Sequence, residues 1–191
     1  MFNIQPIGNP IFEAVTVADL KAHCRVYGTA DDTYLATLRV AARQQVEQDL
    51  NMIVAGQTYR LYSDGFSPIT LPLAPIVSVD EITYLDADGE RQTLSADLYT
   101  VKNYTDPVTI DFTGTLPPGT GIQVDFTAGF TLDDPEEPEG ANSVPQLIKH
   151  AIMFLVAHWF EHRESSSDRL VREVPQGYQR IIDRLRVSRY R

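Results

Sequence analysis

Residues 144–164, VPQLIKHAIMFLVAHWFEHRE, decide the fold of this chain. Val144-Pro145 opens a helix, because proline is accommodated in the first turn, and the pattern predicts helix to about Glu164. When the residues are projected at about 100° each, apolar side chains cover every side of this helix, so we expect it to be a central core element. The residues that we assign to core packing are Leu147, Ala151, Phe154, Leu155, Trp159 and Phe160.

The same stretch contains HWFEH, residues 158–162, which is the H-x-x-E-H pattern of inverted zinc peptidases. On a helix His158 and His162 lie about 40° apart, so both could reach one metal ion. A catalytic zinc needs three protein ligands, and the only glutamates that follow, Glu164 and Glu173, do not lie in a suitable helix. We therefore expect no catalytic residue, no metal and no cofactor, and keep a zinc metallopeptidase that uses HWFEH as an alternative.

The composition is that of an ordinary globular protein of 191 residues, with 43% hydrophobic and 22% charged residues. Its single cysteine excludes an intramolecular disulfide. The longest apolar run, residues 151–157, is far shorter than the roughly 20 residues that cross a bilayer, and the N-terminus shows no secretion signal. We expect synthesis in the cytoplasm and no membrane partner.

Upstream of residue 57 the hydrophobic period is helical. Thr16 and Asp19 form a capping box for one helix, and residues 31–50 form a long amphipathic one. The second helix has a long, regular polar face.

From residue 57 to 130 the pattern alternates, which predicts strands over residues 58–62, 76–85, 108–112 and 122–126. The last two strands should pair as a hairpin. An acidic linker and a basic helix over residues 176–187 complete the chain.

The expected fold class is α+β, a helical bundle of about four helices with a β-rich insertion of antiparallel hairpins. The expected parts are N-terminal helices (1–56), the β-rich insertion (57–130), the acidic linker (131–143) and C-terminal helices with a basic arm (144–191).

Charge is divided unevenly along the chain, whose net charge is −10. Residues 168–191 carry +4, so the preceding 167 residues carry −14. An acidic body repels nucleic acid, whereas an arginine-rich end binds phosphates or an acidic protein surface, or is simply a solvated helix.

The order of segments resembles the head-to-tail connector (adaptor, or head completion) proteins of long-tailed bacteriophages, in the longer version with a β-rich insertion that occurs in phages, prophages and gene transfer agents. The resemblance lies in five stretches: VTVADLKAHCRVYGTADDTYLATLRVAARQQVE (15–47), ITLPLAPIVSVDEITYLDADGE (69–90), VDFTAGF (124–130), VPQLIKHAIMFLVAHWFEHRE (144–164) and VPQGYQRIIDRLR (174–186).

This resemblance implies a structural, non-enzymatic virion protein in the neck of the particle. It implies a homo-oligomeric ring, a dodecamer, below the portal protein, which extends the channel for DNA without sequence-specific binding and provides the attachment surface for the next neck, stopper or tail protein. We assign docking on the portal to Arg180, Arg184, Arg186, Arg189 and Arg191. The polar face of the helix over residues 31–50 either lines this ring or is a solvated outer face, and the pattern does not decide between the two. A DNA-binding packaging accessory protein, which would bind duplex through the same arginines, is the remaining alternative.

Overall fold

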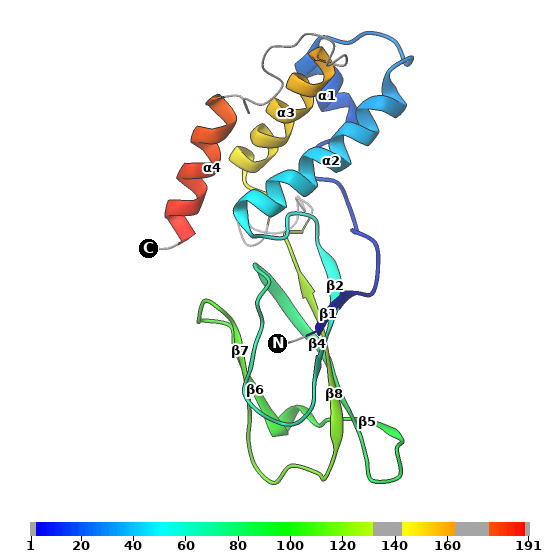
Figure 1. Cartoon of the computed structure of the whole chain (residues 1–191), viewed down its shortest axis with the longest axis vertical. Helices are drawn as coiled ribbons and strands as arrows, with labels where there is room; N and C mark the ends of the chain where they lie inside the picture. Colours follow the sequence, from blue (N-terminus) through cyan, green and yellow to red (C-terminus); the bar gives the residue numbers. More distant parts are fainter. Residues whose placement is uncertain (1–2, 132–142, 163–175, 190–191) are drawn as a thin grey trace. The chain divides into compact units, whose positions relative to one another are not determined.

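The computed structural model of the chain describes residues 3–131, 143–162 and 176–189. The chain divides into two compact units. The β unit comprises Met1–Ile11 and Ala55–Phe130, and the helical unit comprises Phe12–Val54 and Thr131–Arg191. The described residues contain four α-helices and antiparallel sheets, so the expected α+β fold is confirmed (Figure 1).

The helical unit consists of α1 (Val17–Cys24), α2 (Asp32–Leu50), α3 (Gln146–Glu161) and α4 (Gln176–Arg189). The expected capping box begins α1: the Oγ1 atom of Thr16 accepts from the backbone N–H of Asp19 at 3.1 Å, and the Asp19 carboxylate accepts from the backbone N–H of Thr16 at 3.0 Å. The hydrogen bond from the Thr16 hydroxyl lowers the pKa of Asp19. Both α1 and α2 end at a left-handed residue, Arg25 (φ 55°) and Asn51 (φ 51°), whose N–H binds carbonyls of the last turn.

Helix α3 packs against each of the other three helices, as expected of a central core element. Figure 1 shows α4 running antiparallel to α3 within this unit. The side chains that are at most 1% exposed in this core come from all four helices and include Leu20, Leu35, Ala42, Val46, Ile148, Ile152, Val156, Tyr178 and Ile182.

The face that α3 buries differs from the expected one. Ala151 and Leu155 are buried, and Trp159 and Phe160 are half-buried. Leu147 and Phe154 are 38% and 36% exposed, so their assignment to core packing is wrong. Ile148, Ile152 and Val156 are buried in their place. Because α3 is apolar on every side, its periodicity carries no information about which side meets α1, α2 and α4.

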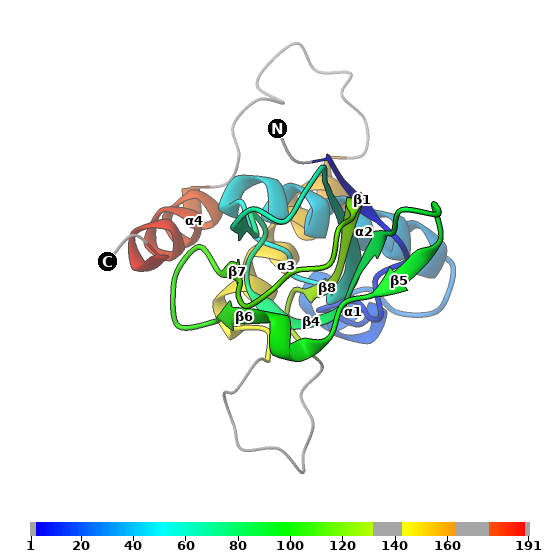
Figure 2. The same ribbon diagram turned by 90° about the horizontal axis from the view of Figure 1, so that it is seen from below.

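The β unit contains two antiparallel sheets. The larger has the order β1-β2-β8-β4-β5, and the smaller has the order β3-β7-β6, with a short 3₁₀ helix η1 (Ala96–Leu98) leading into β6. The strands are β1 (Asn3–Pro6), β2 (Gln57–Ser63), β3 (Ile69–Thr70), β4 (Ile76–Leu85), β5 (Arg91–Thr93), β6 (Tyr99–Lys102), β7 (Thr109–Phe112) and β8 (Thr120–Ala128). Figure 2 shows the smaller sheet beside the larger one.

Strand β8 is the central strand of the larger sheet, with β2 on one side and β4 on the other. Its side chains alternate between buried Ile122, Val124 and Phe126 and half-exposed Gln123 and Asp125. One face of the larger sheet is therefore apolar and the other polar, which is typical of an antiparallel sheet with one solvated side.

The expected pairing of residues 108–112 with 122–126 is wrong. Strand β7 pairs with β3 and β6, whereas β8 pairs with β2 and β4. The alternation correctly indicated that both strands have an apolar face, since Ile110 of β7 is also fully buried. It could not identify the neighbours, because matching apolar faces occur equally in two sheets that share a core.

The first eleven residues belong to the β unit rather than to the helices, with which they were grouped in the expected segment 1–56. Strand β1 pairs with β2, from Asn3 opposite Tyr62 to Pro6 opposite Tyr59. Its proline is tolerated because β1 is an edge strand. Most of the expected acidic linker, residues 132–142, lies outside the described residues.

No helix in the described part of the chain combines the length and the apolar character that crossing a bilayer requires.

Candidate functional site

The histidines of HWFEH are adjacent at the end of α3. Their ring centroids lie 4.6 Å apart, and Nδ1 of His162 is 2.8 Å from the carbonyl oxygen of His158. No group of three or more His, Cys, Asp or Glu side chains able to hold a metal ion occurs within residues 3–131, 143–162 and 176–189. Glu164 and Glu173 lie outside these residues. The described residues thus bring together two side chains of ligand type and provide no third, and a catalytic zinc needs three.

An ion-pair network lies on the polar face of α2, for which lining a ring and a solvated outer face were both left open. Arg43 is only 6% exposed. Its Nε donates to Glu13 at 3.0 Å and its Nη1 to Glu47 at 2.7 Å. The other Glu47 oxygen accepts from the backbone N–H of Val54 at 2.9 Å. Burial opposes the charge on Arg43, but the two glutamates outweigh it and raise the Arg43 pKa.

This network fixes the chain before α1 and the chain after α2 to the same point of α2. The spacing of Arg43 and Glu47, four residues apart on a helix, was a signal for one of its ion pairs. Glu13 lies 30 residues from Arg43 and could not be found from the sequence. At Arg43 the polar face of α2 is therefore not a free surface for lining a ring.

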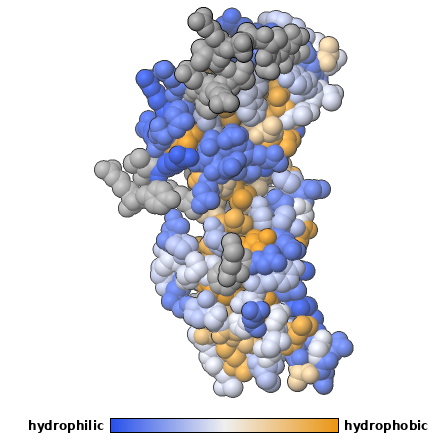
Figure 3. All heavy atoms as spheres, in the orientation of Figure 1, coloured by the Kyte–Doolittle hydropathy of each residue, from blue (hydrophilic) through white to orange (hydrophobic). Residues whose placement is uncertain are grey.

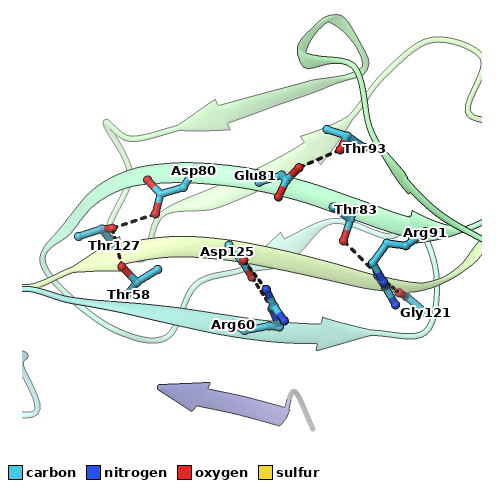
Figure 4. A network of polar contacts seen from close by, with 10 residues as sticks. All are labelled: Thr58, Arg60, Asp80, Glu81, Thr83, Arg91, Thr93, Gly121, Asp125 and Thr127. Atoms are coloured by element: carbon cyan, nitrogen blue, oxygen red, sulfur yellow. Dashed lines mark hydrogen bonds and ion pairs between the residues drawn. The ribbon is translucent and has the colours of Figure 1, made fainter. Parts of the chain in front are cut away.

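The polar face of the larger sheet carries paired side chains, drawn in Figure 4. Arg60 on β2 donates two hydrogen bonds of 2.7 Å to the carboxylate of Asp125 on β8. This bond to Asp125 raises the Arg60 pKa. Nearby, Thr127 donates to Asp80 at 2.8 Å and Thr93 donates to Glu81 at 2.8 Å. These bonds join β2 to β8, β8 to β4 and β5 to β4.

The β unit is strongly acidic. It contains ten acidic and three basic residues, a net charge of −7. All three basic side chains have partners within the unit: Arg60 binds Asp125, Lys102 binds Asp111 at 2.5 Å, and Arg91 donates to Thr83 and to the carbonyl of Gly121. A surface of this kind repels phosphate groups.

Helix α4 is held to the end of α2 through Asp49. The hydroxyl of Tyr178 donates to the Asp49 carboxylate, and Nε of Arg186 donates to the Asp49 carbonyl oxygen at 2.6 Å. Burial, together with the hydrogen bond to Asp49, raises the pKa of Tyr178. Because Tyr178 and Ile182 are each 1% exposed, α4 is an integral part of the helical core.

The five arginines assigned to docking do not share one environment. Arg180 and Arg184 are exposed on α4. Arg186 is exposed as well, but its Nε is occupied by the Asp49 carbonyl. The side chain of Arg189, the last residue of α4, and all of Arg191 lie outside the described part of the chain. Arg180 and Arg184 are therefore the pair with described guanidinium groups available to a partner.

Comparison with known proteins connects this architecture to particle necks. The sequence model of the phage gp6-like head-tail connector protein family matches residues 100–186. No curated protein matches the chain.

Among solved structures, a chain in the neck of an empty GTA particle, computed with C6 symmetry, superposes with a TM-score of 0.73 at 23% identity, over 96% of this chain and 95% of that one. A chain in the virion of a native gene transfer agent particle gives 0.70 at 24% identity, over 96% and 94% of the two chains. A chain in the neck of a native GTA particle, computed with C12 symmetry, gives 0.66 at 23% identity, with the same coverage.

At identities of 23–24%, the structural matches establish a common fold. The family match adds similarity in sequence, from β6 through most of α4. The resemblance to head-to-tail connector proteins is therefore confirmed, and residues 100–186 of this chain carry the sequence pattern of the phage gp6-like head-tail connector family.

Proposed function

We propose that this chain is a structural connector in the neck of a phage or gene transfer agent particle. Copies of it form a ring, a dodecamer, below the portal. The ring extends the channel for DNA and provides the attachment surface for the next neck, stopper or tail protein. The observation that best supports this proposal is that the chain matches the connector family over residues 100–186 and also shares the fold of GTA neck chains over 96% of its length.

The negative charge of the β unit supports the proposal that DNA moves through a channel formed by the ring. A channel wall that held phosphates tightly would slow the duplex, because each phosphate contact by Lys or Arg adds affinity. Within the β unit, all three basic side chains are occupied by its own groups, and seven acidic charges are left in excess. DNA therefore passes without sequence-specific binding, and the role of the protein is structural rather than catalytic.

Docking on the portal is assigned to α4, and specifically to Arg180 and Arg184, whose guanidinium groups are exposed on a helix that is itself anchored by Tyr178 and Asp49. An anchored helix presents its charges in a fixed geometry, which reduces the entropy lost on binding. The partner surface is acidic.

The test of docking is binding of this protein to the purified portal protein of the same particle, measured by surface plasmon resonance. Charge reversal in Arg180→Glu/Arg184→Glu should weaken binding by at least about tenfold, mainly through a slower association rate. The matched variant Arg180→Lys/Arg184→Lys keeps the charge and should bind within a few-fold of wild type. Deleting α4 is not a clean test, because the deletion uncovers the core around Ile182.

The ring itself is tested by negative-stain imaging of the complex with the portal. We expect rings of this protein below each portal. Portals that remain bare at saturating concentrations of the wild-type protein would contradict the proposed function. Equal binding of the Glu variant and wild type would contradict only the assignment of docking to α4.

A further inference from the structure

The two histidines at the end of α3 form a pair that the connector role leaves unused. Figure 3 shows apolar side chains at the surface among polar ones, which is ordinary for a protein, so exposure alone does not identify a site. The pair of His158 and His162 is distinguished by its chemistry instead. Imidazole nitrogen is a ligand for nickel, copper and zinc ions, and two residues four apart lie on the same face of a helix.

The two rings are close enough to share one ion. Their centroids lie 4.6 Å apart, and their planes are inclined by 39°. Two nitrogens that each bind one zinc ion at about 2.0–2.1 Å are separated by at most about 4.2 Å, which is twice the longer bond. The two side chains can therefore reach a common ion through changes in their own torsion angles, without a change in the backbone of α3.

The backbone of α3 prepares His162 as a ligand. Nδ1 of His162 lies 2.8 Å from the carbonyl oxygen of His158. A carbonyl oxygen can only accept, so Nδ1 carries the proton, and Nε2 of the neutral ring presents its lone pair. Histidine ligands of metals almost always donate their other N–H to a carbonyl, a carboxylate or water, which fixes the tautomer and the orientation of the ring. The carbonyl of His158 supplies this second contact.

The pair is open to solvent. His162 is exposed and His158 is half-buried, so an ion can reach both rings. In the part of the chain that the structure describes, no third His, Cys, Asp or Glu joins them in a group able to hold a metal. Two protein ligands leave the remaining coordination positions to water. A site of this kind differs from the three-ligand catalytic zinc that HWFEH suggested.

We propose that His158 and His162 bind one divalent transition-metal ion, of the nickel, copper and zinc series, through two imidazole nitrogens, with water completing its coordination. Imidazole suits each of these three ions. The site needs no third protein ligand, and it does not depend on the proposed role in the neck.

The experiment is isothermal titration of the full chain, without an affinity tag, with nickel chloride. We expect one saturable site per chain, with a dissociation constant in the micromolar range. Replacing either imidazole removes one of the two ligands, so His158→Ala and His162→Ala should each weaken binding at least about tenfold. His162 is exposed, so His162→Ala keeps the test valid even if His158→Ala fails to fold.

The two other histidines provide a matched control. His23 and His150 are also exposed, and each contacts the ring of Phe154, at 6.1 Å and 6.3 Å between centroids. The double variant His23→Ala/His150→Ala therefore removes the same number of exposed imidazoles as the loss of the pair, and it should bind nickel as wild type does. Urea unfolding of each variant without metal shows whether it is folded.

Three results would overturn the proposal. They are the absence of saturable binding up to about 1 mM nickel, an unchanged affinity in His162→Ala, and loss of the site in folded His23→Ala/His150→Ala. Binding to the portal and imaging of rings test the proposed function separately, because neither measurement depends on a metal ion at this pair.

Discussion

Replacing Arg43 tests whether the buried network of α2 holds the helical unit together. In Arg43→Met the side chain keeps its apolar stem but loses both ion pairs. Two carboxylates, Glu13 and Glu47, are then left facing one site without their cation. Their side chains are 17% and 15% exposed and that of Arg43 is 7% exposed, so water replaces the lost partner poorly. Removing one partner of a buried ion pair costs about 3–5 kcal/mol.

The magnitude should lie near the lower end of that range, about 3 kcal/mol, because both glutamates retain some contact with solvent. With a urea dependence of about 2 kcal/mol per M, this loss lowers the unfolding midpoint by about 1.5 M. Trp159, the only tryptophan, lies in α3 and reports unfolding of the helical unit through its fluorescence.

Two further variants separate the network from the charge alone. Arg184→Met removes an exposed arginine of the same unit and should change the free energy of unfolding by less than about 0.5 kcal/mol. The double variant Arg43→Met/Glu13→Gln should be less destabilised than the sum of its single changes, since the second change removes one of the stranded charges. If Arg43→Met lowers the free energy of unfolding by less than about 1 kcal/mol, the network of Arg43, Glu13 and Glu47 has no structural role of the kind assigned to it.

Two other predictions concern the helical core. Ile152→Ala should cost about 2–5 kcal/mol in the free energy of unfolding, while Leu147→Ala should cost less than about 1 kcal/mol; the reverse order in urea unfolding would mean that α3 buries its other face. Tyr178→Phe should lower the free energy of unfolding by about 1 kcal/mol at pH 8, because the hydrogen bond to Asp49 is lost. The control Tyr27→Phe, at a residue that is 92% exposed, should leave it unchanged. Folding raises the pKa of Tyr178, so the stability that this group contributes is complete below the unfolded pKa of about 10 and is lost as the pH rises further. Between pH 9 and 11 the free energy of unfolding should therefore fall more steeply for wild type than for Tyr178→Phe. Equal slopes for the two proteins would contradict this prediction.

Much of the secondary structure was predictable because it is encoded in local periodicity. Helices α1, α2 and α4 and the strands β2, β4, β7 and β8 each correspond to a run with a period of 3.6 or 2. Helix α3 corresponds to a long apolar stretch, and the start of α1 corresponds to the capping box at Thr16. The shortest strands, such as β3 with two residues, have no period to detect. Strand β1 has four residues and lies far in sequence from β2, its neighbour, so only pairing defines it.

The candidate sites follow the same division. The sequence located α4 and its arginines, but it could not distinguish Arg186 from Arg180 and Arg184. Arg186 donates to the carbonyl of Asp49, which lies more than a hundred residues away in the chain, so no local pattern reveals the contact. Likewise, a five-residue pattern placed His158 and His162 together, whereas a third metal ligand is a matter of tertiary proximity.

The sequence by itself determined the fold class, the order of helices and strands, the acidic character of the β unit and the resemblance to connector proteins, because each is a property of composition or of short-range pattern. The tertiary structure alone decided which side of α3 is buried, which strands are neighbours, and that Arg43 is an internal cation. These depend on contacts between residues far apart in the chain. In α3, apolar on every side, packing against α1, α2 and α4 leaves Leu147 and Phe154 partly exposed.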